Sequence, residues 1–204
     1  KIDTVSEIKL LVHNNRNTVT KAVELFKKDN PSAIFTISNS VDADYDEFDL
    51  IITVDATKYK GYSGELLLTE DVVLAMRSDY GLSSREALAV GDLKNERFIT
   101  MTNGSNIHKL TVDICRENGF DPEFAVQIDD PYYIRKFVEL GLGIAFIPSI
   151  SWQGLFSNKV IFKNVGNYKR DTYILTKNGK YLTAAVKKFY ELLKNISKDV
   201  PSAI

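Results

Sequence analysis

The sequence predicts an α/β fold of two lobes that are joined by two crossing strands. Near the N-terminus, the apolar runs 8–12 and 33–37 flank a helical pattern at about 17–29. The same strand–helix–strand order returns in residues 97–148. Apolar strands separated by helices indicate parallel sheets with right-handed crossovers. A long apolar run at 66–76 can leave one sheet and enter another, so we expect two lobes rather than one.

In the first lobe, the opening strand leads through a polar loop into the helix at about 17–29, which Pro31 ends because proline breaks the helical hydrogen bonding. Strand-like runs follow at 33–37 and 48–53. Residues 38–47 between them are too short and too acidic for a full helix, so we expect a loop or a single turn. The apolar face of the helix is formed by Val19, Ala22, Val23 and Phe26.

The elements of the second lobe are separated by turn signals. They are strands at 97–101 and 124–128 and a helix at 105–118, which Gly119 ends. The chain then returns to the first lobe with a strand at 171–176 and a helix at about 180–196. The run 159–165 is the candidate for the second crossing strand. These assignments give a first lobe of residues 1–76 and 164–204 and a second lobe of residues 77–163.

Residues 131–148, PYYIRKFVELGLGIAFIP, are the most informative segment. Pro131 suits the first turn of a helix, and Asp129 and Asp130 precede it as capping candidates. Gly141 ends the helix, and the run 144–147 reads as a buried strand that Pro148 ends.

This helix, glycine pair, strand and proline resemble the "v-x-x-G-x-G-i-a-x-l-P" signature of LysR-type transcriptional regulators, where it lies in the ligand-sensing domain. The runs IKLLVHNNRNTVTKAVELFKKDNPSAIFTIS, FDLIIT, LLLTEDVVLAMRSDYGLS and GDLKNERFITMT resemble further elements of that domain, in order and at the right spacing. The resemblance covers nearly all 204 residues. It implies two Rossmann-like lobes of the type 2 periplasmic-binding-protein-like fold, with a small effector bound in the cleft between the lobes.

The resemblance departs from the family in two places. Segment 38–47 is shorter than the helix that the family usually has there, which could remodel one side of the cleft. The winged helix-turn-helix and linker helix of a full regulator are not found in this chain. DNA binding is therefore expected only through a missing N-terminal domain.

Composition limits the remaining classes of function. Lys plus Arg is 26 against 27 for Asp plus Glu, a net charge of −1, which argues against direct nucleic-acid binding. No apolar run is long enough to cross a membrane, so no membrane partner is expected. The single cysteine, Cys115, lies in an apolar helical stripe, which favours buried packing and fits a cytoplasmic location. His13 and His108 have no partner at metal-ligand spacing, and His108 is expected to face solvent. We expect no catalysis, cofactor or metal.

Three loops are the candidate ligand site, because open α/β sheets bind ligands at the carboxyl ends of their strands and helix N-termini offer free N–H groups. Asn, Thr and Ser side chains and a bidentate Arg16 could hold a carboxylate. The predicted ligand-binding residues are Asn14, Asn15, Arg16, Thr18, Thr102, Asn103, Gly104, Ser105, Asp129, Asp130, Tyr132 and Phe146.

Each of these residues also has an ordinary structural interpretation. Asn, Ser, Thr and Asp before helices commonly act as caps that contribute about 1 kcal/mol without any ligand. Asp129 and Asp130 could suit an amine or amino acid, or one could cap the helix while the other faces water. Tyr132 and Phe146 could wall an apolar part of the pocket or belong to the core.

The resemblance also implies an antiparallel side-by-side homodimer, with a tetramer as an alternative for the full-length protein. Its expected interface residues are Val19, Val23, Phe26, Tyr133 and Lys136. Two other functions remain open from the sequence: a solute-binding protein of a transporter, and a small transferase or dehydratase on the same fold. The second lacks a convincing catalytic set, since no G-x-S-x-G, Walker A or Rossmann glycine pattern occurs.

Overall fold

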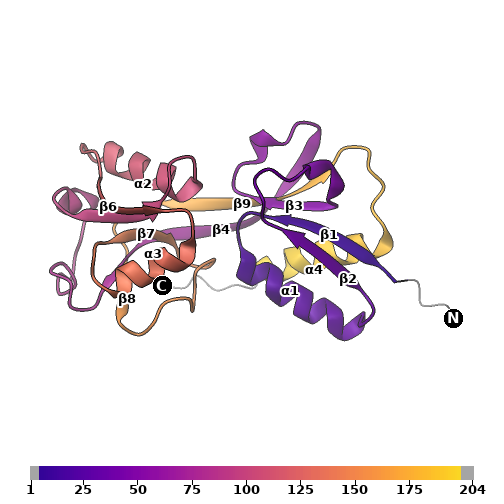
Figure 1. The fold of residues 1–204 in the computed structure, drawn as a ribbon, viewed down its shortest axis with the longest axis horizontal. Coiled ribbons are helices and arrows are strands. Elements are labelled where there is room, and N and C mark those ends of the chain that lie inside the picture. Colours follow the sequence, from indigo (N-terminus) through magenta and orange to yellow (C-terminus); the bar gives the residue numbers. More distant parts are fainter. Residues whose placement is uncertain (1–4, 199–204) are drawn as a thin grey trace. The chain divides into compact units, whose positions relative to one another are not determined.

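The computed structural model describes residues 5–198 and has the predicted α/β architecture (Figure 1). It divides into unit 1, residues 5–70 with 170–198, and unit 2, residues 71–169. The chain passes between the units within two long strands, β4 (Tyr62–Arg77) and β9 (Lys169–Lys177). The full strand order is β2-β1-β3-β9-β4-β7, with β8 also paired to β4, and β5-β6 forms a second sheet.

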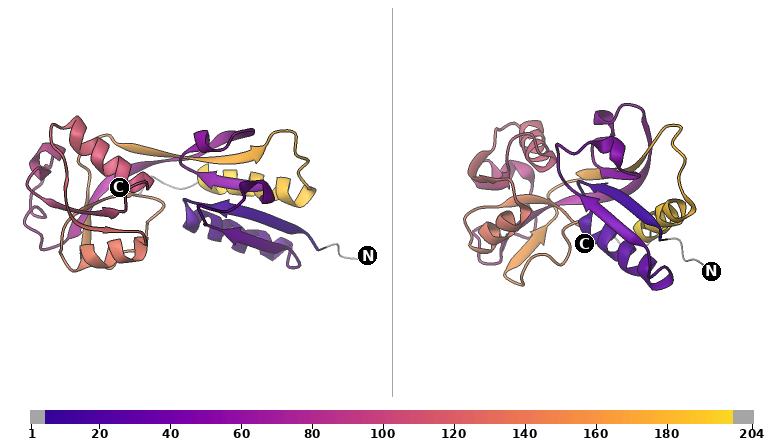
Figure 2. Two further views of the ribbon diagram at one scale, coloured as in Figure 1. Left: turned by 45° about the horizontal axis from the view of Figure 1, so that its top comes forward. Right: turned by 45° about the vertical axis from the view of Figure 1, so that its right-hand side comes forward.

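In unit 1, β1 pairs in parallel with both β2 and β3, and β3 pairs antiparallel with β9. Two helices, α1 and α4, pack together on one face of this sheet (Figure 2). Phe26 of α1 and Phe189 of α4 meet edge-to-face there, with ring centroids 5.6 Å apart. The elements are β1 (Glu7–Val12), α1 (Arg16–Asp29), β2 (Ile34–Ser38), β3 (Leu50–Thr53) and α4 (Ala184–Lys198).

The other face of the unit 1 sheet is covered by short turns rather than a helix. Segment 38–47 contains only the 3-10 turn η1 (Tyr45–Glu47), as predicted, and η2 (Ala56–Lys58) follows β3. Tyr45, Tyr59 and Tyr62 pack on Leu11 and Ile51 of the sheet. Three tyrosine rings thus cover this face, because segment 38–47 forms a short turn rather than a longer helix.

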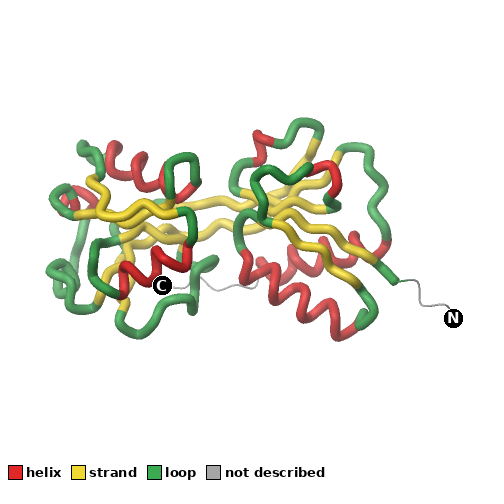
Figure 3. Tube along the Cα trace, viewed as in Figure 1, coloured by secondary structure: helices red, strands yellow, loops and turns green. Residues whose placement is uncertain are grey.

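In unit 2, the second half of β4 pairs antiparallel with β7 and β8, while β5 and β6 are parallel neighbours. Helices α2 and α3 contribute to two separate core clusters, so each covers its own part of the sheets (Figure 3). The elements are η3 (Val90–Leu93), β5 (Arg97–Met101), α2 (Asn106–Glu117), β6 (Glu123–Ile128), α3 (Pro131–Glu139), β7 (Ala145–Pro148) and β8 (Val160–Lys163).

Segment 131–148 forms the predicted helix, turn and strand. Pro131 begins α3, and Gly141 has the positive φ of 74° that ends a helix in the left-handed region. Ile144 N–H then donates to Arg97 C=O at 3.0 Å, and Ile99 N–H donates to Ile144 C=O at 2.8 Å. The strand β7 is thereby attached beside β5.

The prediction that residues 159–165 form the second crossing strand was wrong. Residues Val160–Lys163 form β8, which pairs with Leu74–Arg77 inside unit 2. The second connection is β9, in which Lys169 belongs to unit 2 and Arg170 to unit 1. Periodicity alone could not separate two short apolar runs that lie this close in sequence.

Candidate functional site

Two of the predicted loops lie side by side in unit 2. Thr102, directly after β5, donates its N–H to the C=O of Ile128, the last residue of β6, at 3.1 Å. Because β5 and β6 are parallel neighbours, the loops 102–105 and 129–130 leave the same edge of the sheet. Asn103 and Asp129 are exposed there. The structure thus brings these two loops together within unit 2.

Two residues of these loops cap helices. The Ser105 hydroxyl accepts from His108 N–H at 3.1 Å at the start of α2, and the Asp130 carboxylate accepts from Tyr132 N–H at 2.8 Å at the start of α3. The ordinary capping interpretation therefore applies to both. Gly104, with φ 95°, provides the turn that carries the chain into α2.

Buried polar atoms without a hydrogen-bond partner also occur in unit 2. Among the described residues, Thr100 Oγ1 and Asn106 Oδ1 are such atoms, at the end of β5 and the start of α2. Buried polar groups nearly always have partners, so these two atoms mark a polar region that has spare hydrogen-bonding capacity.

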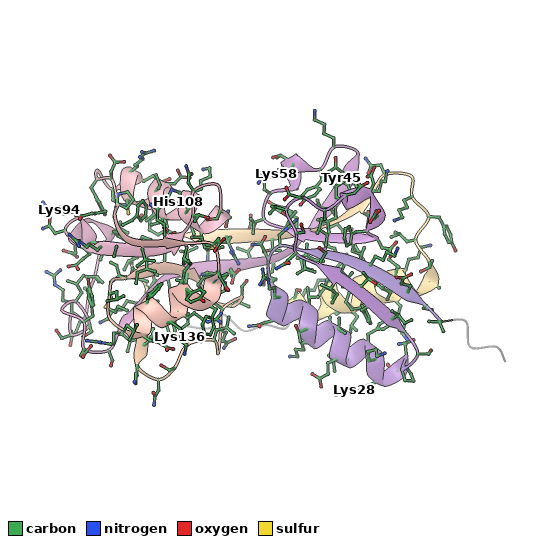
Figure 4. All side chains as sticks on the ribbon, in the orientation of Figure 1. Lys28, Tyr45, Lys58, Lys94, His108 and Lys136 are labelled. Carbon is green, nitrogen blue, oxygen red and sulfur yellow. The ribbon has the colours of Figure 1, made fainter. Side chains whose placement is uncertain are left out.

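The prediction that His108 faces solvent was wrong. Its ring is half-buried and lies against Phe124 with ring centroids 5.1 Å apart. Figure 4 labels His108 on unit 2. His108 lies about two helical turns before the buried Cys115, so it shares the packed face of α2 rather than the opposite one.

In unit 1, the loop between β1 and α1 is held by its own asparagines. Asn15 adopts the left-handed conformation, with φ 57°, and its buried amide donates to Thr172 Oγ1 of β9 at 2.5 Å. Asn14 Oδ1 accepts from Val54 N–H at 3.1 Å. Arg16 is exposed, whereas Thr18 is buried. The asparagine side chains thus fix the loop, and Arg16 is its accessible charged group.

A histidine and aromatic cluster lies beside that loop. The His13 ring stacks on Tyr59, with centroids 6.4 Å apart, and Tyr59 contacts Tyr45 and Tyr62 in turn. Burial, and then the nearby charges of Lys58 and Arg16, lower the pKa of His13 below its ordinary value. His13 is therefore neutral near pH 7.

The loops after β5 and β6 in unit 2 and the β1–α1 loop in unit 1 offer polar groups that can bind a ligand. Figure 4 labels Lys58 and Tyr45 on unit 1, where Lys58, like Arg16, is exposed. Residues 5–198 contain no group of three or more His, Cys, Asp and Glu side chains that could hold a metal ion. In the same range, no helix is long and apolar enough to cross a bilayer.

Several predicted site residues belong to the core. Phe146 is 1% exposed and stacks on Phe98, so it cannot wall a ligand pocket as predicted. Val19 and Phe26 are 3% and 2% exposed in the core of unit 1, so neither can offer contact area to a second subunit. Their apolar face was predicted correctly, but it packs on the sheet of its own unit. By contrast, Tyr132, Tyr133 and Lys136 are exposed on α3, and Val23 is half-buried.

One buried ion pair was not predicted from the sequence. Arg170 donates to Glu70 Oε1 from Nη2 at 2.7 Å and from Nε at 3.2 Å, and both side chains are almost fully buried. Thr69–Asp171 and Asp71–Lys169 pair on either side of it, each at 2.6 Å. A signal was present in the sequence, because Thr69-Glu70-Asp71 interrupts one apolar strand and Lys169-Arg170-Asp171 begins another.

Comparison with known proteins identifies a matching family model and relatives of similar sequence. The model of the family described as "LysR substrate binding domain" matches residues 19–197. The transcriptional dual regulator GltC of Bacillus subtilis is 22% identical over 140 residues, which cover 67% of this chain and 46% of GltC. The regulator XapR of Escherichia coli is 25% identical over 132 residues, or 62% of this chain and 43% of XapR. The chain thus spans about half the length of these relatives.

Solved structures share the fold over nearly the whole chain. The effector-binding domain of QuiR in complex with shikimate has a TM-score of 0.79 at 18% identity, covering 96% of this chain and 98% of that one. The regulatory domain of CcmR from Synechocystis PCC6803 in complex with 2-PG has a TM-score of 0.85 at 17% identity, covering 97% and 100%.

Proposed function

The chain belongs to the LysR substrate-binding domain family, and we propose that it senses a small-molecule effector through loops at the carboxyl ends of its strands: those after β5 and β6 in unit 2, and the one after β1 in unit 1. The observation that carries this proposal is the adjacency of loops 102–105 and 129–130 at one sheet edge. Exposed Asn103 and the unpartnered Asn106 Oδ1 supply neutral hydrogen-bonding groups there. The shikimate and 2-PG complexes of QuiR and CcmR support a ligand of small-metabolite size.

The charges of unit 1 favour an effector that carries an anionic group. Arg16 and Lys58 are exposed beside the β1–α1 loop, and Arg16 can bind a carboxylate in bidentate fashion. Asp129 is an exposed acidic group of unit 2 and favours an additional amine or hydroxyl donor on the ligand. We therefore infer a polar acid, with hydroxyl or amino substituents, as the effector class.

The consequence of binding is proposed to be a change in transcription. Relatives such as GltC and XapR are named as regulators, which favours this role over that of a transporter's solute-binding protein. With a net charge of −1, this chain is not expected to contact DNA itself, so DNA contact is assigned to a further domain of the full regulator. Differential affinity of the effector for two arrangements of the domain would carry the signal without catalysis, in the cytoplasm.

A thermal-shift panel of amino acids, dicarboxylates, hydroxylated ring acids including shikimate, and sugar phosphates tests the effector proposal. A ligand at 100 times its dissociation constant stabilises the fold by about 2.7 kcal/mol, which raises Tm by roughly 5–10 °C for a chain of this size. We expect a polar acid to produce this shift. Asn103→Ala should reduce the shift and leave the ligand-free Tm unchanged, because Asn103 is exposed.

Asn158→Ala is the matched control, since Asn158 is an exposed asparagine elsewhere in unit 2. Ser105→Ala is less informative, because loss of its cap lowers stability by about 1 kcal/mol without any ligand. A panel in which no compound raises Tm would contradict sensing and favour a pure dimerisation module.

We also propose that the domain works as a homodimer. Tyr132 and Tyr133 form an exposed aromatic pair on α3, and Lys136 lies over the Tyr132 ring at 5.6 Å. Sedimentation equilibrium should give a dimer at high micromolar concentration, and Tyr133→Glu should shift it towards monomer by placing a charge in an apolar contact. Tyr181→Glu, at an exposed tyrosine of unit 1, should not. A wild-type monomer at that concentration would count against the regulator proposal as a whole.

A further inference from the structure

Unit 2 contains a small apolar pocket that is separate from the loops proposed for the effector. It has a volume of about 80 Å³ and is lined by Val73, Ile147, Ser149, Trp152, Gln153, Gly154 and Phe162. All of these residues belong to unit 2. None of them is in the loops after β5 or β6, so the pocket is a second place where unit 2 could bind a molecule.

The sheet and an aromatic group form the walls of this pocket. Val73 of β4 and Ile147 of β7 are directly paired across the antiparallel ladder, and both are buried. The Phe156 ring packs between those of Trp152 and Phe162, with centroids 6.3 Å and 5.4 Å away. Phe162 is 41% exposed, which gives a ligand access from solvent.

Two polar side chains, Ser149 and Gln153, accompany these apolar walls. The Ser149 hydroxyl is buried and has no hydrogen-bond partner among the described residues, while the residue as a whole is 8% exposed. Its backbone is fixed, because Ser149 N–H donates to Asp71 C=O at 2.9 Å. A buried hydroxyl can donate one hydrogen bond and accept two, and a buried hydroxyl that makes no hydrogen bond lowers the stability of the fold. The side chain therefore has unused capacity for a ligand.

We propose that this pocket binds the ring of a small aromatic compound that carries one hydrogen-bonding substituent, such as a phenol. Aromatic and aliphatic walls suit the ring, and Ser149 suits the single hydroxyl. The volume is several times the roughly 10–15 Å³ that one water requires but about half the roughly 150 Å³ of a cavity that encloses benzene, so the ring would lie partly outside the pocket, beside the exposed Phe162. A polyhydroxylated acid would leave most of its polar groups unpaired against these walls. The pocket and the effector loops thus select different ligand classes.

The tryptophan in the wall provides a direct test, because Trp152 is the only tryptophan in the sequence. Phenol and toluene, which have nearly the same shape, are titrated while Trp152 emission is excited beyond the absorption of phenol. We expect saturable changes with both. Ser149→Ala should weaken phenol binding about threefold to tenfold, the worth of one hydrogen bond, and leave toluene binding unchanged. Phe162→Ala should weaken both ligands.

Two control variants establish whether the fluorescence change comes from this pocket. Tyr181→Ala, at an exposed aromatic residue of unit 1, and Asn103→Ala, in the proposed effector loops, should leave both titrations unchanged. Ser149→Ala should not lower Tm, because the hydroxyl it removes has no partner. Absence of a saturable signal, phenol binding that Ser149→Ala leaves intact, or loss of binding in Asn103→Ala would each overturn the proposal. The effector panel can succeed or fail independently of these outcomes.

Discussion

Replacing Arg170 by methionine should lower the free energy of unfolding by about 3–5 kcal/mol, the largest effect expected for this chain. The guanidinium donates to the Glu70 carboxylate at 2.7 Å, and the two side chains are 4% and 0% exposed. Methionine fills much of the space but leaves a carboxylate buried without the cation that faces it. Urea unfolding monitored by circular dichroism would measure the loss.

A double replacement distinguishes a lost ion pair from a general packing defect. Glu70→Leu combined with Arg170→Met removes both charges, so we expect most of the stability to return. Lys169→Met is the matched control on the same strand, because its pair with Asp71 is partly exposed and is worth less than about 1 kcal/mol. An Arg170→Met protein as stable as Lys169→Met would show that the buried pair contributes little.

Gly143→Ala should be the next most damaging change, at about 1–3 kcal/mol. A Cβ at this position would lie 2.5 Å from the Arg97 carbonyl oxygen and 3.2 Å from Ile99 Cγ1. The Arg97 carbonyl accepts the hydrogen bond from Ile144 N–H, so the added methyl would force β7 away from β5. A lower urea midpoint would be the observable result.

Gly91→Ala is the control for this substitution. Nothing lies within 4 Å of a Cβ at Gly91, and its φ is not in the left-handed region, so stability should stay within about 0.5 kcal/mol. A Gly143→Ala protein as stable as Gly91→Ala would mean that the second glycine of the motif is not required by packing.

The loop at the start of α1 shows why the candidate site was only partly predictable. The run His13-Asn14-Asn15-Arg16 correctly marked a loop at the carboxyl end of a strand. Its two asparagines could be ligands or structural residues. Only the positions of Thr172 and Val54, distant in sequence, assign both amides to holding the loop. The exposed Arg16 is left as the group that can meet a ligand.

Local signals in the sequence determined the elements of this protein. Helical spacing, Pro131 at a first turn and Gly141 at a helix end specified α3 and β7, because capping and backbone preference act within a few residues. Contacts between distant segments were decided only by the tertiary structure. The sequence identified the apolar face of α1, but whether that face meets its own sheet or a second subunit depends on which surfaces pack together. The same holds for Arg170, whose burial beside Glu70 requires two strands a hundred residues apart.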